Sequence, residues 1–133
     1  MAGLVIKLGP RERLLLNGAV VENGDRRTRL SVLTPNTNVL RMKDAMRPEE
    51  AQTPVRRICY ISQLALSGDA AADKAKHQIL LGIEQLSQVL RDDDSRSILG
   101  DATHAVLEHD FYKTLRLLRS LIDREARLLN LSH

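Results

Sequence analysis

The chain of 133 residues has almost no aromatic side chains: it contains no Trp, one Phe (Phe111) and two Tyr (Tyr60 and Tyr112). Its core must therefore be built from aliphatic side chains. The scarcity of rings also argues against the class of RNA-binding domain that stacks single-stranded bases on aromatic side chains. Cys59 is the only cysteine, which excludes an internal disulfide and a zinc site built from cysteines. At this length we expect a single compact unit.

Long apolar runs are missing as well. No segment approaches the roughly 20 consecutive apolar residues that a membrane-spanning helix needs. Residues 1–9 lack the charged leader and the long apolar run of a secretory signal. We therefore expect a cytoplasmic protein that neither crosses nor binds a membrane.

Signatures of catalysis are also absent. The sequence contains no Gly-rich phosphate loop, no nucleophile elbow and no metalloprotease motif. His104 and His109 are five residues apart, not the three or four that place two ligands on one helix face. Asp92, Asp93 and Asp94 lack the alternating spacing of a calcium loop, and we expect Asp94 to cap the following helix. The sequence predicts no enzyme, no catalytic residue, no metal and no cofactor.

Positive charge is concentrated in the first half of the chain. Residues 1–66 carry 11 Lys and Arg against 6 Asp and Glu, a balance of +5, whereas residues 67–133 carry 9 against 11, a balance of −2. Such an asymmetry favours an anionic partner for the first half. Ordinary solubilising charge on exposed strands is the alternative explanation.

The pattern of the first half predicts short strands separated by turns. Asn17-Gly18 and Asn23-Gly24 suit two-residue hairpin loops, so at least one of them should close a hairpin, and we place Arg26 and Arg27 just beyond the second. Runs of four to six residues that lie between turn signals and are rich in branched aliphatic side chains predict strands at residues 4–8, 13–16, 19–22, 28–33, 39–42 and 56–61.

From Ser67 onward the apolar period becomes helical. Ser67 or Asp69 is expected to cap a first helix, whose apolar stripe is formed by Ile79, Ile83, Leu86 and Leu90. A second helix is predicted over about residues 95–109.

A third helix is predicted to begin near Asp110. It carries Phe111, Leu115, Leu118 and Ile122 on one side, a wider apolar face than one neighbouring helix covers. Either the chain itself or a second subunit or partner protein must cover this face, which makes it a candidate protein-interaction site.

The predicted fold class is α+β. An antiparallel β-rich lobe of about five or six short strands, residues 1–66, is followed by a bundle of about three α-helices, residues 67–133, packed on it in one unit.

Basic side chains punctuate the strand lobe and are the candidate RNA-binding residues, because arginine grips phosphate through two hydrogen bonds and each neutralised phosphate releases counterions. If the strands form a meander, these side chains could converge on one face. The competing explanation pairs Arg27 and Arg29 with Glu22, Asp25 or Asp44 at little energetic effect. The candidates are Arg26, Arg27, Arg29, Arg41, Lys43, Arg56 and Arg57.

Three segments resemble the FlbT family, the flagellin translation regulators of alphaproteobacteria: "LNGAVVENGDRR" (16–27), "VLRMKDAM" (39–46) with "TPVRRICY" (53–60), and "FYKTLRLLRSLIDREARLL" (111–129). The resemblance implies a cytoplasmic post-transcriptional regulator that binds the 5′ untranslated region of flagellin mRNA and promotes its degradation, although some members favour flagellin synthesis. Residues 4–21 are also similar to the opening strands of the carbon storage regulator, a dimeric β-rich RNA binder.

Two functions remain open from the sequence. The chain is either an RNA-binding repressor of flagellin translation or a protein-interaction module whose helical half binds flagellin, the flagellar regulator FlaF or a second copy of itself.

Overall fold

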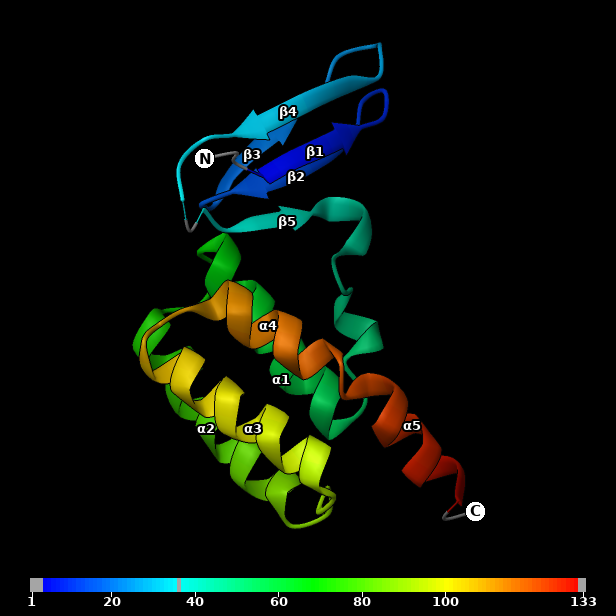
Figure 1. Ribbon diagram of the computed structural model, residues 1–133, viewed down its shortest axis with the longest axis vertical. Coiled ribbons are helices and arrows are strands. Elements are labelled where there is room, and N and C mark those ends of the chain that lie inside the picture. Colours follow the sequence, from blue (N-terminus) through cyan, green and yellow to red (C-terminus); the bar gives the residue numbers. More distant parts are fainter. Residues whose placement is uncertain (1–3, 36, 132–133) are drawn as a thin grey trace. The chain divides into compact units, whose positions relative to one another are not determined.

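The computed structural model describes residues 4–35 and 37–131 and divides the chain into two compact units, Met1–Ala45 and Met46–His133. Within the described residues the first unit contains five strands and the second five α-helices (Figure 1). The strands are β1 (Leu4–Leu8), β2 (Arg13–Leu16), β3 (Ala19–Glu22), β4 (Thr28–Val32) and β5 (Val39–Arg41). The helices are α1 (Pro54–Ser67), α2 (Ala72–Ser87), α3 (Asp93–Leu107), α4 (Phe111–Arg119) and α5 (Ile122–Leu131). Two single-turn 3-10 helices, η1 (Met42–Asp44) and η2 (Pro48–Glu50), follow β5.

The five strands form two small antiparallel sheets, one ordered β1-β4 and the other β3-β2-β5. Among the described strands, β2 and β3 are the one consecutive pair that forms a hairpin, so the strands do not form the meander considered as one possible arrangement. The hairpin turn is Asn17-Gly18, whose φ angles of 50° and 86° are those of a two-residue turn that matches strand twist.

The second Asn-Gly pair does not close a hairpin, which corrects the placement predicted for Arg26 and Arg27. β3 and β4 are not paired, and Gly24 lies outside the left-handed region. The Asn23 side chain instead donates hydrogen bonds to the carbonyl oxygens of Gly9, at 2.7 Å, and Arg26, at 2.9 Å. Asn23 therefore ties the β3–β4 connection to the turn that follows β1.

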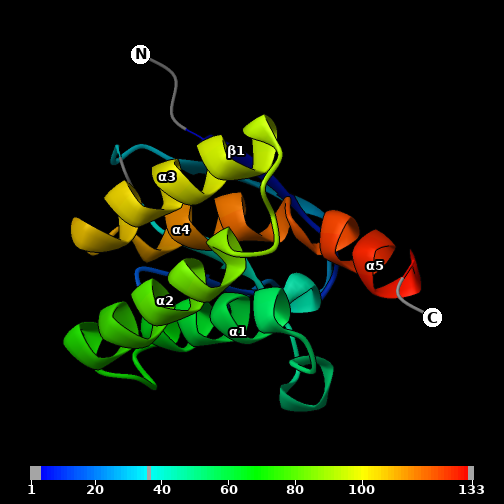
Figure 2. The same ribbon diagram turned by 90° about the horizontal axis from the view of Figure 1, so that it is seen from below.

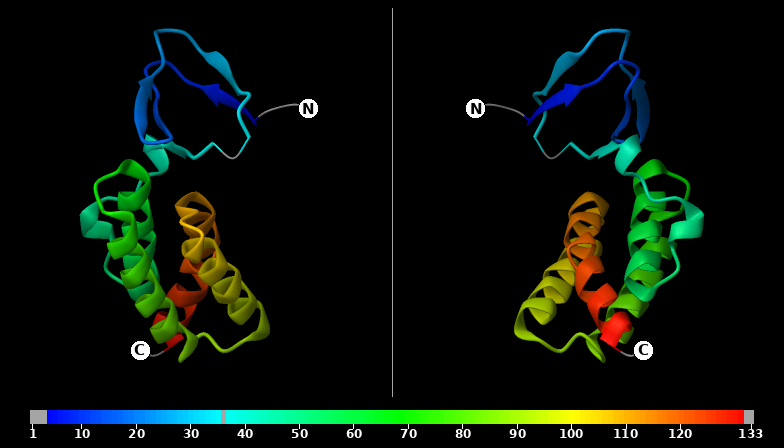
Figure 3. Two further views of the ribbon diagram at one scale, coloured as in Figure 1. Left: turned by 90° about the vertical axis from the view of Figure 1, so that its left-hand side faces the viewer. Right: turned by 90° about the vertical axis from the view of Figure 1, so that its right-hand side faces the viewer.

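The two sheets share one aliphatic core. Its buried members come from both sheets, namely Ile6, Leu8, Leu14 and Val39, and partly buried side chains from β2, β3 and β4 surround them. Figure 3 shows the blue strands of the β2–β3 hairpin on one side of this unit and β1 and β4 on the other. Alternation along β1 buries Ile6 and Leu8 and leaves Lys7 between them exposed.

In the second unit α1 packs against α2 and α4, and α3 packs against the same two helices (Figure 2). The predicted apolar stripe is buried: Ile79, Ile83 and Leu86 belong to α2, and Leu90 lies just beyond its end. Gly82 permits the close approach of α1 and α2, since a Cβ at this position would lie 2.3 Å from Cγ2 of Ile58. Among the described residues, none of the helices combines the length and the apolar character that crossing a bilayer requires.

The predicted bundle of about three helices is wrong, and the largest error is α1. The sequence predicts a strand at residues 56–61 from a short run rich in branched aliphatic residues, and this prediction extends the β-rich lobe to residue 66. The structure instead ends the first unit at Ala45. Thr53 caps α1 by accepting a hydrogen bond from the Arg56 backbone N–H at 3.2 Å, and Pro54 occupies the first helical position.

The third predicted helix is two helices. The backbone N–H groups of Ser120 and Leu121 donate to carbonyls three residues back, those of Leu117 and Leu118, and the Ser120 hydroxyl also donates to the Leu117 carbonyl. This tight turn ends α4 and starts α5 in a new direction.

Two helix starts also differ from the expected ones. α2 begins at Ala72, because Gly68 with a φ of 82° terminates α1 and Ser67 belongs to that helix. α3 is capped by Asp92, whose carboxylate accepts a hydrogen bond from the Ser95 N–H at 3.0 Å, and not by Asp94.

Candidate functional site

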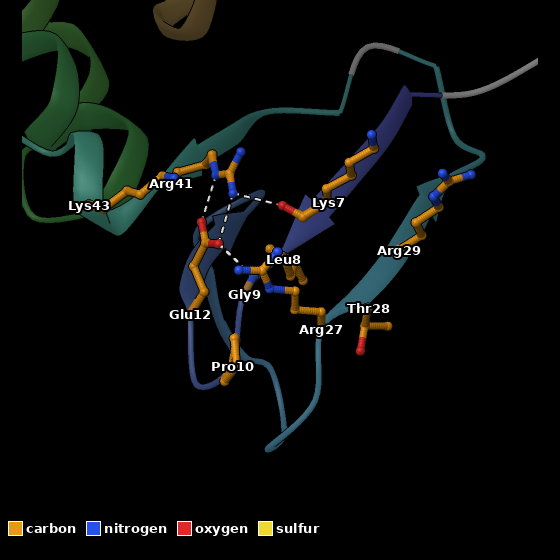
Figure 4. Close-up of a pocket in the computed structure, with 10 residues that line it drawn as sticks. All are labelled: Lys7, Leu8, Gly9, Pro10, Glu12, Arg27, Thr28, Arg29, Arg41 and Lys43. Atoms are coloured by element: carbon orange, nitrogen blue, oxygen red, sulfur yellow. Dashed lines mark hydrogen bonds and ion pairs between the residues drawn. The ribbon is translucent and has the colours of Figure 1, made fainter.

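A pocket of about 520 Å³ lies within the first unit, and half of its ten lining residues are cationic (Figure 4). We call it the cationic pocket and define it by five residues that surround it: Lys7, Arg27, Arg29, Arg41 and Lys43. Glu12 is the one acid among its lining residues. Four of the five cations were candidates from the sequence, and the strand pairing brings them together although they come from separate segments.

Each cation is positioned by an element of the first unit. Lys7 extends from the exposed face of β1, and Arg29 lies directly opposite it on β4. Arg27 precedes β4, Arg41 ends β5 and Lys43 lies in η1. The antiparallel pairing of β1 with β4, which are separated by some 20 residues of chain, creates the pocket.

Arg41 is held by Glu12. Its Nε donates to Glu12 Oε2 at 2.6 Å and its Nη2 to Oε1 at 2.8 Å, while Nη2 also donates to the Lys7 carbonyl at 2.7 Å. The Gly9 N–H donates to Glu12 Oε1 at 3.0 Å. These bonds, with those from Arg41 strongest, lower the pKa of Glu12 to about 2, and Glu12 in turn raises the pKa of Arg41.

Two other acids of the first unit, Glu22 and Asp25, form ion pairs outside the pocket. Arg11 contacts Asp25 at 2.6 Å and Glu22 at 3.5 Å, and Arg13 contacts Glu22 at 2.7 Å. Hydrogen bonding to Arg13, followed by its charge, lowers the pKa of Glu22. Glu22 and Asp25, two of the three carboxylates proposed as partners for Arg27 and Arg29, are thus bound to other arginines.

Four cations of the pocket form no ion pair: over residues 4–35 and 37–131, no carboxylate lies within 4.0 Å of Lys7, Arg27, Arg29 or Lys43. The charge of Lys43 nevertheless helps to lower the pKa of Glu12. The first unit as a whole carries eight Lys and Arg against four Asp and Glu. Its pocket is therefore an electropositive surface built on strands.

Three candidates do not join this pocket. Arg26 is exposed in the β3–β4 connection but does not line it. Arg56 and Arg57 belong to the first turn of α1 in the second unit, where Arg57 is exposed and Arg56 half-buried.

Sequence reasoning missed two members of the site. Lys7 is not among the RNA-binding candidates, although it is the single charge in the predicted strand "LVIKL", which indicates an exposed position. Glu12 carried no local signal, because its partner Arg41 is 29 residues away.

The apolar face predicted for protein contact is largely covered by the second unit itself. Phe111, Leu115 and Leu118 are no more than 6% exposed, and Ile122 is half-buried. α4, which carries the first three, packs against both α1 and α3.

A second pocket of about 530 Å³ lies where the connection from α2 to α3 meets α5. Two exposed apolar side chains line it, Val89 at 62% and Leu128 at 43%. Arg124 at its edge donates to Asp92 at 3.0 Å and to the Ser95 hydroxyl at 3.0 Å. Although most of its lining residues are charged, this pocket exposes more apolar side chain than the face of α4 does.

Side chains that could act as nucleophiles or metal ligands, such as Cys59 and His109, belong to the second unit. In the described part of the chain no three His, Cys, Asp or Glu side chains gather as metal ligands. Cys59 is buried, and this burial raises the pKa of its thiol to about 12. The ring of His109 stacks on that of Phe111 at 5.8 Å and its Nε2 lies 3.3 Å from Asp73.

Comparison with known proteins assigns the chain to a family. A family model described as "Flagellar protein FlbT" matches residues 4–129. The chain is 36% identical to the "Probable flagellum biosynthesis repressor protein FlbT" of Caulobacter sp. (strain K31), over 95% of each chain. It is 35% identical to the "Flagellum biosynthesis repressor protein FlbT" of Caulobacter vibrioides (strain ATCC 19089 / CIP 103742 / CB 15), over 92% of this chain and 86% of that relative. A Rhodopseudomonas palustris (strain TIE-1) relative, a "Probable flagellum biosynthesis repressor protein FlbT", is 33% identical over 96% of this chain and 98% of its own. No solved structure matches the chain.

Proposed function

The chain belongs to the FlbT family of flagellar proteins, and from this premise we propose that it regulates flagellum biosynthesis after transcription by binding RNA. In this proposal the first unit binds the 5′ untranslated region of flagellin mRNA through the cationic pocket, and binding promotes degradation of the message. The names of the relatives support a role as a repressor of flagellum biosynthesis.

The observation that carries the proposal is the excess of positive charge in the pocket. In the part of the chain that the structure describes, four cations with no acid within 4.0 Å line a pocket of about 520 Å³. Phosphate groups are the ligands that such a surface attracts, and arginine binds them bidentately. Residues 1–45 contain no aromatic ring, so affinity must come from the RNA backbone and not from base stacking.

Gel-shift titration of the whole protein with a flagellin leader transcript tests this function. If each of the four cations neutralises its own phosphate on a single strand, the slope of log K against log salt concentration should be about −3, and it should be about −2 if two of them share one phosphate. An unrelated RNA of equal length is the control. Binding that does not weaken with salt, or equal affinity for the control RNA, contradicts a specific messenger-binding regulator.

The degradation step is tested in cells. The half-life of flagellin mRNA should lengthen when the protein is deleted, and it should stay long when the deleted gene is replaced by one encoding Arg27→Glu together with Lys43→Glu. Restoration of normal decay by this double variant would show that the cationic pocket is not required.

A second candidate function is supported by the exposed apolar side chains Val89 and Leu128. Here the second unit binds flagellin or FlaF and affects translation indirectly. Pull-down of the whole protein from an RNase-treated lysate should then retain flagellin or FlaF, and Val89→Ser with Leu128→Ser should release it. If neither protein is retained, this alternative fails.

A further inference from the structure

The register of the β1–β4 sheet places two positive charges directly opposite each other. Lys7 is paired with Arg29, and both side chains are on the exposed face. Opposing residues in an antiparallel pair have Cβ atoms about 4.5–5.5 Å apart, and like charges in this arrangement destabilise the sheet. Within the parts of the chain that the structure describes, no carboxylate lies within 4.0 Å of either group.

The same unit contains the opposite arrangement. Arg13 on β2 is directly across from Glu22 on β3, and the two side chains form an ion pair at 2.7 Å. The sequence thus places complementary charges at one cross-strand position and like charges at another. Like charges at directly opposed positions of a sheet are normally avoided, and such a departure without a compensating group nearby is typical of a functional site.

We propose that Lys7 and Arg29 form a clamp for one phosphodiester group of the bound RNA. This inference rests on the proposed function and adds to it a contact that does not depend on sequence. A phosphodiester spreads its negative charge over two non-bridging oxygens, so one oxygen accepts from the Lys7 ammonium and the other from the Arg29 guanidinium. The bound phosphate would cancel the repulsion between the two cations.

Arg41 has a different role from these two residues. Its Nε and Nη2 are engaged by the Glu12 carboxylate and the Lys7 carbonyl, so Arg41 fixes the β1 backbone from which Lys7 extends. Figure 4 shows the Lys7 and Arg29 side chains directed away from the Glu12–Arg41 pair. Lys7 and Arg29 therefore remain available to an external anion.

The clamp predicts opposite effects on stability and on binding. Lys7→Gln or Arg29→Gln removes the repulsion, so each should raise the melting temperature at low salt by a few degrees. Each should also weaken binding to the leader transcript about tenfold and reduce the salt slope by about 0.7. A residue with a purely structural role would lower the melting temperature.

The two substitutions should be strongly non-additive in binding. If both cations hold the same phosphate, the first substitution already breaks the clamp and the second costs less in combination than alone. Lys7→Arg keeps the charge and should keep the affinity within about twofold. The matched control is Arg13→Gln, which removes one exposed cation from the paired position, so it should lower the melting temperature slightly and leave RNA affinity within about twofold.

Thermal melting and RNA titration of the whole protein, with the flagellin leader transcript as probe, decide between the outcomes. Higher melting temperature together with weaker binding for both single variants supports the clamp. If the unaltered protein binds the transcript but Lys7→Gln and Arg29→Gln bind equally well, or if both variants melt earlier, the clamp is refuted and the proposed function survives. If the unaltered protein does not bind the transcript, both fail.

Discussion

Glu125 offers the sharpest test of how the second unit is held together. This side chain from α5 is only 6% exposed, and its Oε2 accepts a hydrogen bond of 2.8 Å from the backbone N–H of Val55, in the first turn of α1. Val55 is fully buried, so no water replaces the carboxylate. Because Arg56 and Arg57 bring positive charge to the same helix start, the carboxylate also offsets an unfavourable interaction with the helix dipole.

We predict that Glu125→Ala destabilises the second unit by about 2 kcal/mol. A hydrogen bond to a charged group contributes about 1.5–3 kcal/mol, and its loss leaves a buried N–H without an acceptor. The better helix propensity of alanine returns a few tenths of a kcal/mol. For a unit of this size the melting temperature should fall by about 8–16 °C. Glu125→Gln keeps an oxygen that accepts from Val55 and should lose about half as much.

Differential scanning calorimetry of the whole protein measures these changes. Asp123→Ala is the matched control, because Asp123 lies exposed in the same first turn of α5 and should shift the melting temperature by less than about 3 °C. If Glu125→Ala melts like Asp123→Ala, the carboxylate does not hold the start of α1 and our account of this contact is refuted.

Three other substitutions test separate parts of the fold. Gly82→Ala should cost about 1 kcal/mol in chemical denaturation, because overpacking against Ile58 outweighs the gain in helix propensity; equal or greater stability would contradict the close helix contact. Asn17→Ala should destabilise the first unit by about 1–2 kcal/mol, since alanine is strained at a φ of 50° and the 3.0 Å bond accepted from the Asn38 N–H is lost; Asn17→Gly should be milder. The Glu12 pKa of about 2 lies below its ordinary 4.5, so its contribution to stability is complete above pH 4.5 and is lost as the pH falls toward 2; urea melts over this range should show a weaker pH dependence for Glu12→Gln, and an unchanged one would refute the interaction.

The strands could be predicted from the sequence because their signals are local. The boundaries expected for the first three strands agree with β1, β2 and β3, and those of β4 and β5 differ by a single residue at one end. Turn residues such as Asn17 and Gly18 terminate these runs through their own backbone preferences. Strand pairing was not predictable in the same way, since β1 meets β4 across two intervening strands.

The first helix shows where local propensity misleads. Ile58, Cys59, Tyr60 and Ile61 favour a strand when considered alone. The apolar positions Val55, Ile58 and Cys59 are instead spaced for one buried helix face, and tertiary packing overrides the propensity.

The candidate site was predictable in part. Arg27, Arg29, Arg41 and Lys43 were recognised by charge alone, and the fold brings them to one pocket. The sequence does not show which of these cations is neutralised, because the ion pair between Glu12 and Arg41 depends on long-range strand pairing.

Crosslinking of the intact protein to a flagellin leader transcript, followed by mass spectrometry of the protein–nucleotide adducts, tests the central claim most directly. We predict adducts on Lys7 and on the segments around Arg29 and Lys43, with competition by excess leader RNA. Adducts confined to the second unit, or none above the level of an unrelated RNA, would contradict the assignment of the cationic pocket to RNA.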